Sequence, residues 1–475
     1  MFALPELPAT ATVVGELPAW ERDLAERGVT LVGDGADLVV ASPDAVPVAL
    51  RSPASALIVD GDRRAAGRLR QHGFAVRRLL PVPVRGSPLV YVDPESRTAA
   101  SYGLRHCISH TERWRALRNR AAGRLAGLGA LPAPDGVVSV AVRQPGPPKL
   151  LAVAAELGAP EDAAWLMRVT PGSVVRRNAL LLFPPGAREP DLVVKFSRLP
   201  GESGHFDREE RGLALAARAG GSVAAHAPRH LGRAEARGHE LSLESAAAGT
   251  ELSVLLRLPG SRRRKLAVLD SIAGWLVAVA RETAAPPPAL QPELDRLARE
   301  VLPLWTDHGV DPAIAAELPP LPASLQHNDV AEENLIVGGN GFTAVDWEWV
   351  EPRGIPLADV VYFGCRALRL LDGALAEEQR DRHFEGLVTG AAPSSPILFR
   401  WVRKLAGALA LPADAVGPLV TLTWLDRGSE SARERRRAEA ASGRRLDPDY
   451  AERCAHTWMT HPRLGPGWSV WRDDG

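Results

Sequence analysis

Residues 324–359 read SLQHNDVAEENLIVGGNGFTAVDWEWVEPRGIPLAD, and this stretch holds the densest chemical pattern in the chain. It presents a carboxylate, Asp329, in a loop and a carboxamide, Asn334, five residues later. The apolar runs 335–337 and 342–347 flank a Gly-Gly-Asn-Gly turn, which predicts a β-hairpin. The hairpin returns a second carboxylate, Asp346, to the same end of the two strands. Oxygen ligands of this kind suit Mg²⁺ better than zinc.

A magnesium site beside a loop carboxylate is suited to phosphoryl transfer, because that reaction needs charge neutralised on the phosphates and a base or orienting group for the attacking hydroxyl. The motif His-x-Asp-x4-Asn, a glycine-rich hairpin and Asp-Trp-Glu resembles the catalytic core of the aminoglycoside phosphotransferase/choline kinase family. The resemblance implies that Asp329 orients or deprotonates the substrate hydroxyl and that His327 keeps the catalytic loop in shape. It implies that Asn334 and Asp346 bind the Mg²⁺ that bridges the ATP phosphates. Asp359 matches a family position that supports the loop.

A kinase-like site also needs a strand lysine that reaches the nucleotide phosphates. Lys195, one of only four lysines in the chain, lies in the apolar run 192–196 and meets this requirement. An inward lysine is costly without a carboxylate partner, and the helical pattern that follows offers Glu209, with Glu210 as the alternative.

Two further segments are candidates for nucleotide contact. The run Pro171-Gly172-Ser173 precedes a predicted strand and could cover the phosphates with backbone amides, so that Gly172 and Ser173 are candidate nucleotide-binding residues. Residues 241–248, ending at Gly249, resemble the strand and hinge that would meet the adenine.

The resemblance implies an α+β, two-lobed protein-kinase-like fold preceded by an N-terminal α/β, Rossmann-like domain. The expected division is 1–133 for the N-terminal domain, 134–249 for the sheet-rich lobe, 250–460 for the helical lobe and 461–475 for an extended tail. Alternating apolar and amphipathic runs predict a partly parallel sheet in residues 1–133, without the glycine fingerprint of a dinucleotide site. The expected strands there are 12–15, 38–41, 56–59 and 89–92, and the expected helices are 19–26, 63–72 and 111–128.

Composition restricts the partners and the compartment. The chain has 475 residues, with 57 Lys plus Arg against 57 Asp plus Glu, so no overall charge draws it to nucleic acid or to an acidic membrane. Three scattered cysteines argue for a reducing compartment, and neither a signal peptide nor an apolar run of ~20 residues is visible. We therefore expect a cytoplasmic protein that binds neither membrane nor nucleic acid; the sequence does not predict its oligomeric state.

The expected activity is ATP- and Mg²⁺-dependent transfer of the γ-phosphoryl group to a hydroxyl of a small molecule, such as a sugar, an amino alcohol or an aminoglycoside-like acceptor. Two alternatives stay open: a kinase-like nucleotide-binding regulatory module without turnover, and an N-terminal-domain transferase with an accessory kinase-like half. Glu332 and Glu333 could attract a polyamine-like substrate or simply face water.

Overall fold

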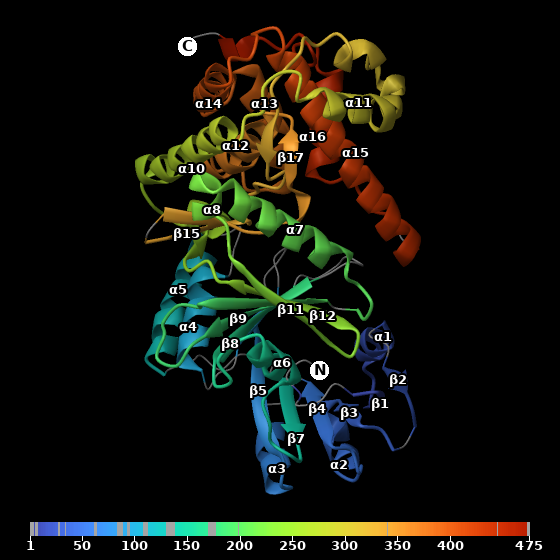
Figure 1. The fold of residues 1–475 in the computed structure, drawn as a ribbon. Coiled ribbons are helices and arrows are strands. Elements are labelled where there is room, and N and C mark those ends of the chain that lie inside the picture. The colour runs from blue at the N-terminus through green and yellow to red at the C-terminus, as the bar shows by residue number, and fades with distance from the viewer. Residues whose placement is uncertain are drawn as a thin grey trace. The chain divides into compact units, whose positions relative to one another are not determined.

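The structure is a computed structural model of the chain (Figure 1). It describes residues 4, 8–26, 29–33, 35–60, 64–82, 89–92, 96–107, 113–129, 138–169, 177–197, 199–339, 341–443 and 445–472. The chain forms two compact units. The first comprises Met1–Asp207 and Pro228–Thr250, and the second comprises Arg208–Ala227 and Glu251–Gly475.

The first unit is built on a twelve-stranded sheet with the order β11-β12-β10-β9-β8-β6-β5-β7-β4-β3-β1-β2. Its strands are β1 (Thr10–Val14), β2 (Thr30–Leu31), β3 (Leu38–Ala41), β4 (Ala56–Asp60), β5 (Ala75–Val82), β6 (Leu89–Val92), β7 (Val138–Val142), β8 (Ala164–Val169), β9 (Arg177–Phe183), β10 (Leu192–Ser197), β11 (His230–Ala236) and β12 (His239–Ser245). Its helices are α1 (Pro18–Glu26), α2 (Val46–Ala49), α3 (Ala65–Gln71), α4 (Arg97–His106), α5 (Arg113–Gly127) and α6 (Lys149–Glu156).

The partly parallel sheet expected near the N-terminus is confirmed. β1 pairs in parallel with β2 and β3, and β3 pairs in parallel with β4. β3 is buried at every position, as its continuous apolar sequence requires in a strand covered on both faces. The Rossmann-like comparison for residues 1–133 stays a prediction.

The expected boundary at residue 133 does not divide the sheet. β7 lies between β4 and β5, where Val140 is the antiparallel partner of both Ile58 and Arg77. Residues 138–142 therefore belong to the same sheet as the N-terminal strands. A proline- and glycine-rich stretch marks a loop in the sequence, but strand pairing is non-local, and composition does not show which strand the chain joins next.

The second unit is mainly helical. Its helices are α8 (Gly221–Ala225), α9 (Leu252–Arg257), α10 (Arg262–Glu282), α11 (Gln291–Glu300), α12 (Ala358–Leu371), α13 (Glu377–Thr389), α14 (Ser395–Ala408), α15 (Val416–Ser442) and α16 (Tyr450–Thr460), and α7 (Gly204–Ala219) enters it from the first unit. Its strands are β13 (Thr250–Glu251), β14 (Ser324–Gln326), β15 (Leu335–Gly338), β16 (Gly341–Ala344) and β17 (Glu351–Gly354). The expected hairpin is confirmed, because β15 and β16 pair antiparallel with Leu335 opposite Ala344.

Helix α12 is the centre of this unit. It is buried at nearly every position from Ala358 to Leu370, and the buried set includes the charged residues Asp359 and Arg369 as well as the apolar ones. A helix so fully enclosed has little freedom to shift. The acidic residue in its first turn, Asp359, is thereby fixed at the start of a rigid element. Among the described residues, no helix combines the length and apolar character that crossing a membrane requires.

The described part of the C-terminal tail is packed rather than extended, which corrects the expectation for residues 461–475. Trp468 is 2% exposed, and its Nε1 donates a hydrogen bond to the carbonyl of Val388 at 2.8 Å. Its ring centroid lies 5.3 Å from that of Trp458 and 5.9 Å from that of Phe399. The glycines and proline around it suggested a loose arm, but the large apolar area of tryptophan outweighs that local signal.

Replacing Trp468 with alanine should lower the free energy of unfolding by roughly 3–5 kcal/mol, because a buried indole and its hydrogen bond are both lost. Chemical denaturation of the full chain measures this change. Leu446→Ala is the control, since Leu446 is 39% exposed and its loss should cost less than about 0.5 kcal/mol. Equal effects of the two substitutions would contradict the packed tail.

Candidate active site

The loop that carries Asp329 is shaped by Asp359. One carboxylate oxygen of Asp359 accepts the backbone N–H of His327 at 2.6 Å, and the other accepts that of Asn328 at 2.9 Å. The Asp359 backbone N–H donates in turn to Oε1 of Gln326 at 3.1 Å. Burial raises the pKa of Asp359, while His327, Arg427 and the two N–H donors oppose that rise. Asp359 thus joins the start of α12 to the residues on either side of His327.

Asn328 occupies the left-handed region at φ 61°, which is uncommon for a residue other than glycine. Its side-chain Nδ2 donates to the carbonyl of Trp349 at 3.0 Å. Asparagine adopts this conformation more readily than other side chains, so the residue at this position suits the turn. Here the bonds from Asp359 and to Trp349 hold the turn that places Asp329.

His327 packs inside the loop, as its predicted supporting role requires. It is 1% exposed, its Nδ1 accepts the N–H of Asp329 at 3.3 Å, and its ring centroid lies 4.5 Å from that of Trp347. Burial lowers the pKa of His327, with the nearby carboxylates of Asp359 and Asp346 acting against it. With Nδ1 accepting, a neutral ring carries its proton on Nε2.

Asp329 and Asn334 lie together, as the sequence predicts. Nδ2 of Asn334 donates to Oδ2 of Asp329 at 2.7 Å and to the Asp329 carbonyl at 3.0 Å. Burial raises the pKa of Asp329, and the neighbouring Asp346 raises it further, while Arg427, Arg366 and Asn334 lower it. Asp329 is a half-buried carboxylate with greater proton affinity than an exposed aspartate.

Asp346 follows the hairpin on the side of the catalytic loop. The Val345 N–H donates to the carbonyl of Asn334 at 2.8 Å, which ties the end of β16 to the start of β15. Asp346 itself lies in the left-handed region at φ 69°. Through Val345 and Asn334, two hydrogen bonds join the segment of Asp346 to Asp329, and the charge of Asp346 raises the pKa of Asp329.

The donor set of Asn334 and Asp346 fits a hard cation. Because Nδ2 of Asn334 donates to Asp329, its amide oxygen is the atom left to act as a ligand beside the Asp346 carboxylate. Within the described ranges, no three or more His, Cys, Asp or Glu side chains are grouped so that they could hold a metal ion. Proteins usually hold Mg²⁺ with one or two side-chain oxygens together with phosphate oxygens and water, and the pair Asn334 and Asp346 is in keeping with that pattern.

Helix α7 packs directly on the Asp-Trp-Glu segment. A Cβ at Gly212 would lie 1.9 Å from the carbonyl oxygen of Trp347, so only glycine permits this approach. Nη2 of Arg208 lies 3.4 Å from Oε2 of Glu348, and the guanidinium lies 5.0 Å from the ring centroid of Trp349. Glu209 is 1% exposed on the same helix.

Lys195 has a carboxylate partner that the sequence analysis missed. It lies in β10 opposite Ala179 and Ser242, and its Nζ is 3.1 Å from Oε2 of Glu244. Alternation along β12 is the signal that could have found Glu244, because it is two residues from Ser242 and on the same face. Glu209 belongs to the second unit and Lys195 to the first, so the pairing of these two residues stays a prediction. Gly172 and Ser173 lie outside the described residues.

The two glutamates of the catalytic loop face arginines. Oε2 of Glu332 accepts from Nε of Arg366 at 2.6 Å, and Oε1 lies 3.4 Å from Nη2 of Arg369. Burial raises the pKa of Glu332, but the two arginines outweigh it and lower the pKa to about 2. Glu333 accepts from the same Arg366 at 2.6 Å. Both carboxylates thus have cationic partners within the protein, and Glu332 anchors the loop to α12.

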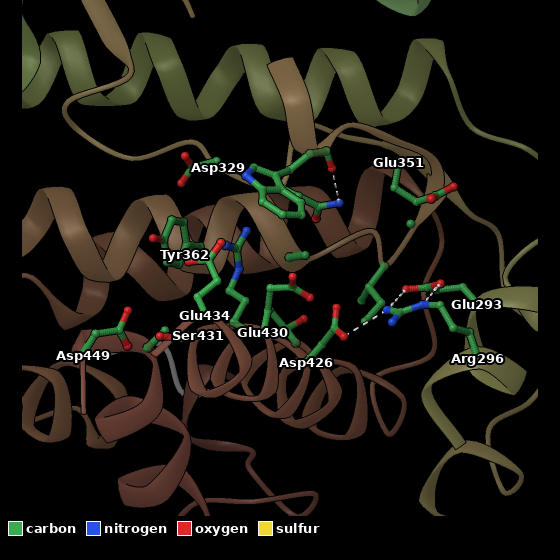
Figure 2. Close-up of a pocket in the computed structure, with 18 residues that line it drawn as sticks. Glu293, Arg296, Asp329, Glu351, Tyr362, Asp426, Glu430, Ser431, Glu434 and Asp449 are labelled. Carbon is green, nitrogen blue, oxygen red and sulfur yellow. Dashed lines mark hydrogen bonds and ion pairs between the residues drawn. The ribbon is translucent and has the colours of Figure 1, made fainter. Parts of the chain in front are cut away.

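A cavity of about 330 Å³ opens beside Asp329 (Figure 2). Its wall includes seven carboxylates and two guanidinium groups. The lining residues are Glu293, Arg296, Asn328, Asp329, Trp349, Glu351, Gly354, Ile355, Ala358, Tyr362, Thr423, Asp426, Arg427, Glu430, Ser431, Glu434, Asp449 and Ala451. Burial raises the pKa of Glu434, and the carboxylates of Glu430, Asp449 and Asp329 raise it further, so the cavity carries a concentrated negative potential.

One face of α15 supplies much of this wall, and the sequence analysis did not identify it. Asp426, Glu430 and Glu434 recur at four-residue spacing and lie on one side of the helix, as Figure 2 shows. This acidic stripe was visible in the sequence. An acidic stripe is usually a solvated helix face, and only the tertiary structure places this one beside Asp329.

Comparison with known proteins gives little to set beside this geometry. The sequence matches no protein-family model and no curated protein. Among solved structures, the chain is similar to an aminoglycoside-3'-phosphotransferase of type VIII, with 17% identity, a TM-score of 0.34 and coverage of 58% of this chain and 97% of that chain. It is also similar to the bifunctional kinase-methyltransferase WbdD, with 11% identity, a TM-score of 0.26 and coverage of 85% and 84%. Likenesses this slight assign neither the fold nor the activity of this chain.

Adding a methyl group at Gly212 tests the close approach of α7 to the site. Gly212→Ala should destabilise the protein by about 1–3 kcal/mol, because the carbonyl of Trp347 must move. The matched control is Gly274→Ala in α10, where an added Cβ meets nothing within 4 Å. That change should be neutral or stabilise the protein by roughly 0.5–1 kcal/mol, as alanine is the better helix former. The same sign for both substitutions in thermal denaturation would refute the constraint.

Proposed function

We propose that this chain is an ATP- and Mg²⁺-dependent phosphotransferase of the protein-kinase-like fold, acting on a hydroxyl of a small molecule that carries amine cations. The observation that carries the proposal is the position of Asp329. Its carboxylate is hydrogen-bonded to Asn334, lies in the neighbourhood of Asp346, and lines a cavity large enough for part of a small acceptor. The sequence resemblance to the aminoglycoside phosphotransferase/choline kinase family supports the same activity.

In the proposed reaction, Asp329 orients the acceptor hydroxyl and takes its proton as the bond to phosphorus forms. The raised pKa of Asp329 suits this role, because a carboxylate of higher proton affinity is the better base. Asn334 fixes one oxygen of that carboxylate, and Asp359 fixes the backbone before it. Asn334 and Asp346 would hold Mg²⁺, which neutralises charge on the phosphates. Catalysis would come mostly from positioning and electrostatics.

The acceptor class follows from the charge of the cavity. Seven carboxylates against two guanidinium groups favour a cationic ligand over a neutral sugar. One of the guanidinium groups, Arg296, is occupied by Glu293 at 2.7 Å and Asp426 at 3.0 Å. The ring of Trp349 adds an aromatic surface of the kind that binds ammonium groups. Of the acceptor classes that the sequence allows, an amino alcohol or an aminoglycoside-like molecule fits best.

A thermal-shift titration tests the nucleotide site. ATP with Mg²⁺ at ~100 times its dissociation constant should stabilise the full chain by about 2.7 kcal/mol. Asp346→Asn should abolish the part of this stabilisation that depends on Mg²⁺, and asparagine is chosen because it tolerates the left-handed backbone at this position. Asp329→Asn should keep the Mg²⁺-dependent stabilisation but slow phosphoryl transfer roughly 10²–10⁴-fold. Lys195→Ala should reduce the shift if Lys195 contacts the phosphates.

Asp307→Asn, at an exposed aspartate, is the control and should behave as wild type. No shift with any nucleotide would refute the proposal and favour a role for the N-terminal residues. A shift without ATP consumption across many acceptors would favour a regulatory module without turnover.

Acceptor charge is tested with an amino sugar and its N-acetylated form. The concentration of acceptor that half-saturates ATP consumption should be lower by a factor of roughly ten or more for the amino sugar than for its N-acetylated form, since only the amine is cationic. A tenfold difference corresponds to about 1.4 kcal/mol of binding free energy. Glu430→Gln and Glu434→Gln should narrow that difference, whereas Glu317→Gln, at an exposed glutamate outside the cavity, should not. Equal use of the two forms by the wild type would exclude the cationic acceptor while leaving the transfer reaction in place.

A further inference from the structure

Arg427 is a guanidinium of the cavity wall with a buried N–H group that the residues described by the structure leave unpaired. It projects from α15, and its guanidinium lies 3.7 Å from the ring centroid of Tyr362. Its Nη2 is 3.9 Å from Oδ1 of Asp359, which is an ion pair but too long for a hydrogen bond. That Nη2 is buried and has no hydrogen-bond partner among the described residues. A buried donor left in this state costs about 1–3 kcal/mol, so its retention calls for a ligand or an ordered water.

The other guanidinium of the cavity shows what a structural arginine looks like there. Arg296 donates to both carboxylate oxygens of Glu293, at 2.8 and 2.7 Å, and to Asp426 at 3.0 Å (Figure 2). Its N–H groups are committed to the protein. Arg427 has the same five donors and, within the part of the chain that the structure describes, gives none of them to a carboxylate. The planar fork of Arg427 is therefore open to an oxyanion.

The position of Arg427 indicates which oxyanion it would bind. Its charge acts on both Asp329 and Asp359, so it lies within electrostatic range of the proposed base. The proposed reaction puts a dianionic phosphoryl group on an oxygen beside Asp329. Seven carboxylates in the wall would repel that group, and with Arg296 paired, Arg427 is the lining guanidinium left to offset the repulsion.

We propose that Arg427 is an oxyanion-binding catalytic residue that holds the phosphoryl group as the acceptor receives it, an inference that rests on the proposed function for the phosphoryl donor. The acceptor oxygen bonds to the γ-phosphorus while the bond from that phosphorus to the bridging oxygen breaks, and ADP leaves with the electron pair. The hydroxyl proton passes to Asp329. The N–H groups of Arg427 bond the non-bridging oxygens during transfer and in the phosphorylated product.

The test measures the binding of inorganic phosphate to the full chain by isothermal titration calorimetry. The titration is done once with ADP and Mg²⁺ present and once without them. Arg427→Gln should weaken phosphate binding at least tenfold. Arg427→Lys keeps the charge but loses the fork, so its affinity should fall between those of wild type and the glutamine variant. Arg436→Gln is the matched control, because Arg436 is an exposed arginine on the same helix and does not line the cavity. It should bind phosphate as wild type does.

The outcomes separate the inference from the function it rests on. Wild-type phosphate affinity in folded Arg427→Gln and Arg427→Lys would overturn the inference, and a lower unfolding temperature with unchanged affinity would show that Arg427 only supports Asp359. If nucleotide binding depends on Asp346 while phosphate binding ignores Arg427, the inference alone fails. If phosphate binding depends on Arg427 but the protein binds no nucleotide, the oxyanion site is supported and the proposed phosphotransferase activity is refuted.

Discussion

The carboxylate of Asp359 is the contact on which the candidate site depends. By accepting the N–H groups of His327 and Asn328, it forces the turn that presents Asp329. The turn requires Asn328 to adopt a left-handed backbone, which asparagine allows more readily than most residues. Asp359 can hold the turn because it begins α12, a helix enclosed by the core of the second unit. The packing of α12 in the core therefore fixes the conformation of the loop that carries Asp329.

A second constraint acts on the Asp-Trp-Glu segment that follows the hairpin. Gly212 lets α7 approach the carbonyl of Trp347 so closely that no side chain would fit, and Arg208 meets Glu348 and Trp349 from the same helix. The segment that follows Asp346 therefore has little room to move. Asn328 closes the arrangement through its bond to Trp349. Asp329 and Asp346 are thus presented by two short segments that are each fixed by packing and also bonded to one another.

Charge is distributed unevenly around this framework. Glu332 and Glu333 share Arg366 as a cationic partner, and Glu293 and Asp426 share Arg296. Glu430 and Glu434 of the acidic stripe and the guanidinium of Arg427 also line the cavity and take no part in these pairs. A cavity with excess negative charge and one open guanidinium suits a ligand that is cationic in its body and receives an anionic group at one point. The proposed acceptor and the proposed role of Arg427 are consequences of this one distribution.

Local sequence patterns determined the parts of the site that are close together along the chain. The spacing of Asp329, Asn334 and Asp346 around a glycine turn predicts the loop and hairpin that the structure has, because a two-strand hairpin fixes the relative positions of its flanking residues. What the sequence left open depends on contacts between distant residues. The place of β7 between β4 and β5, Glu244 as a partner of Lys195, the packed Trp468 and the acidic face of α15 beside Asp329 follow from strand pairing and helix packing. Such contacts are decided by which distant surfaces exclude water together, and that choice is a property of the whole folded unit rather than of any segment.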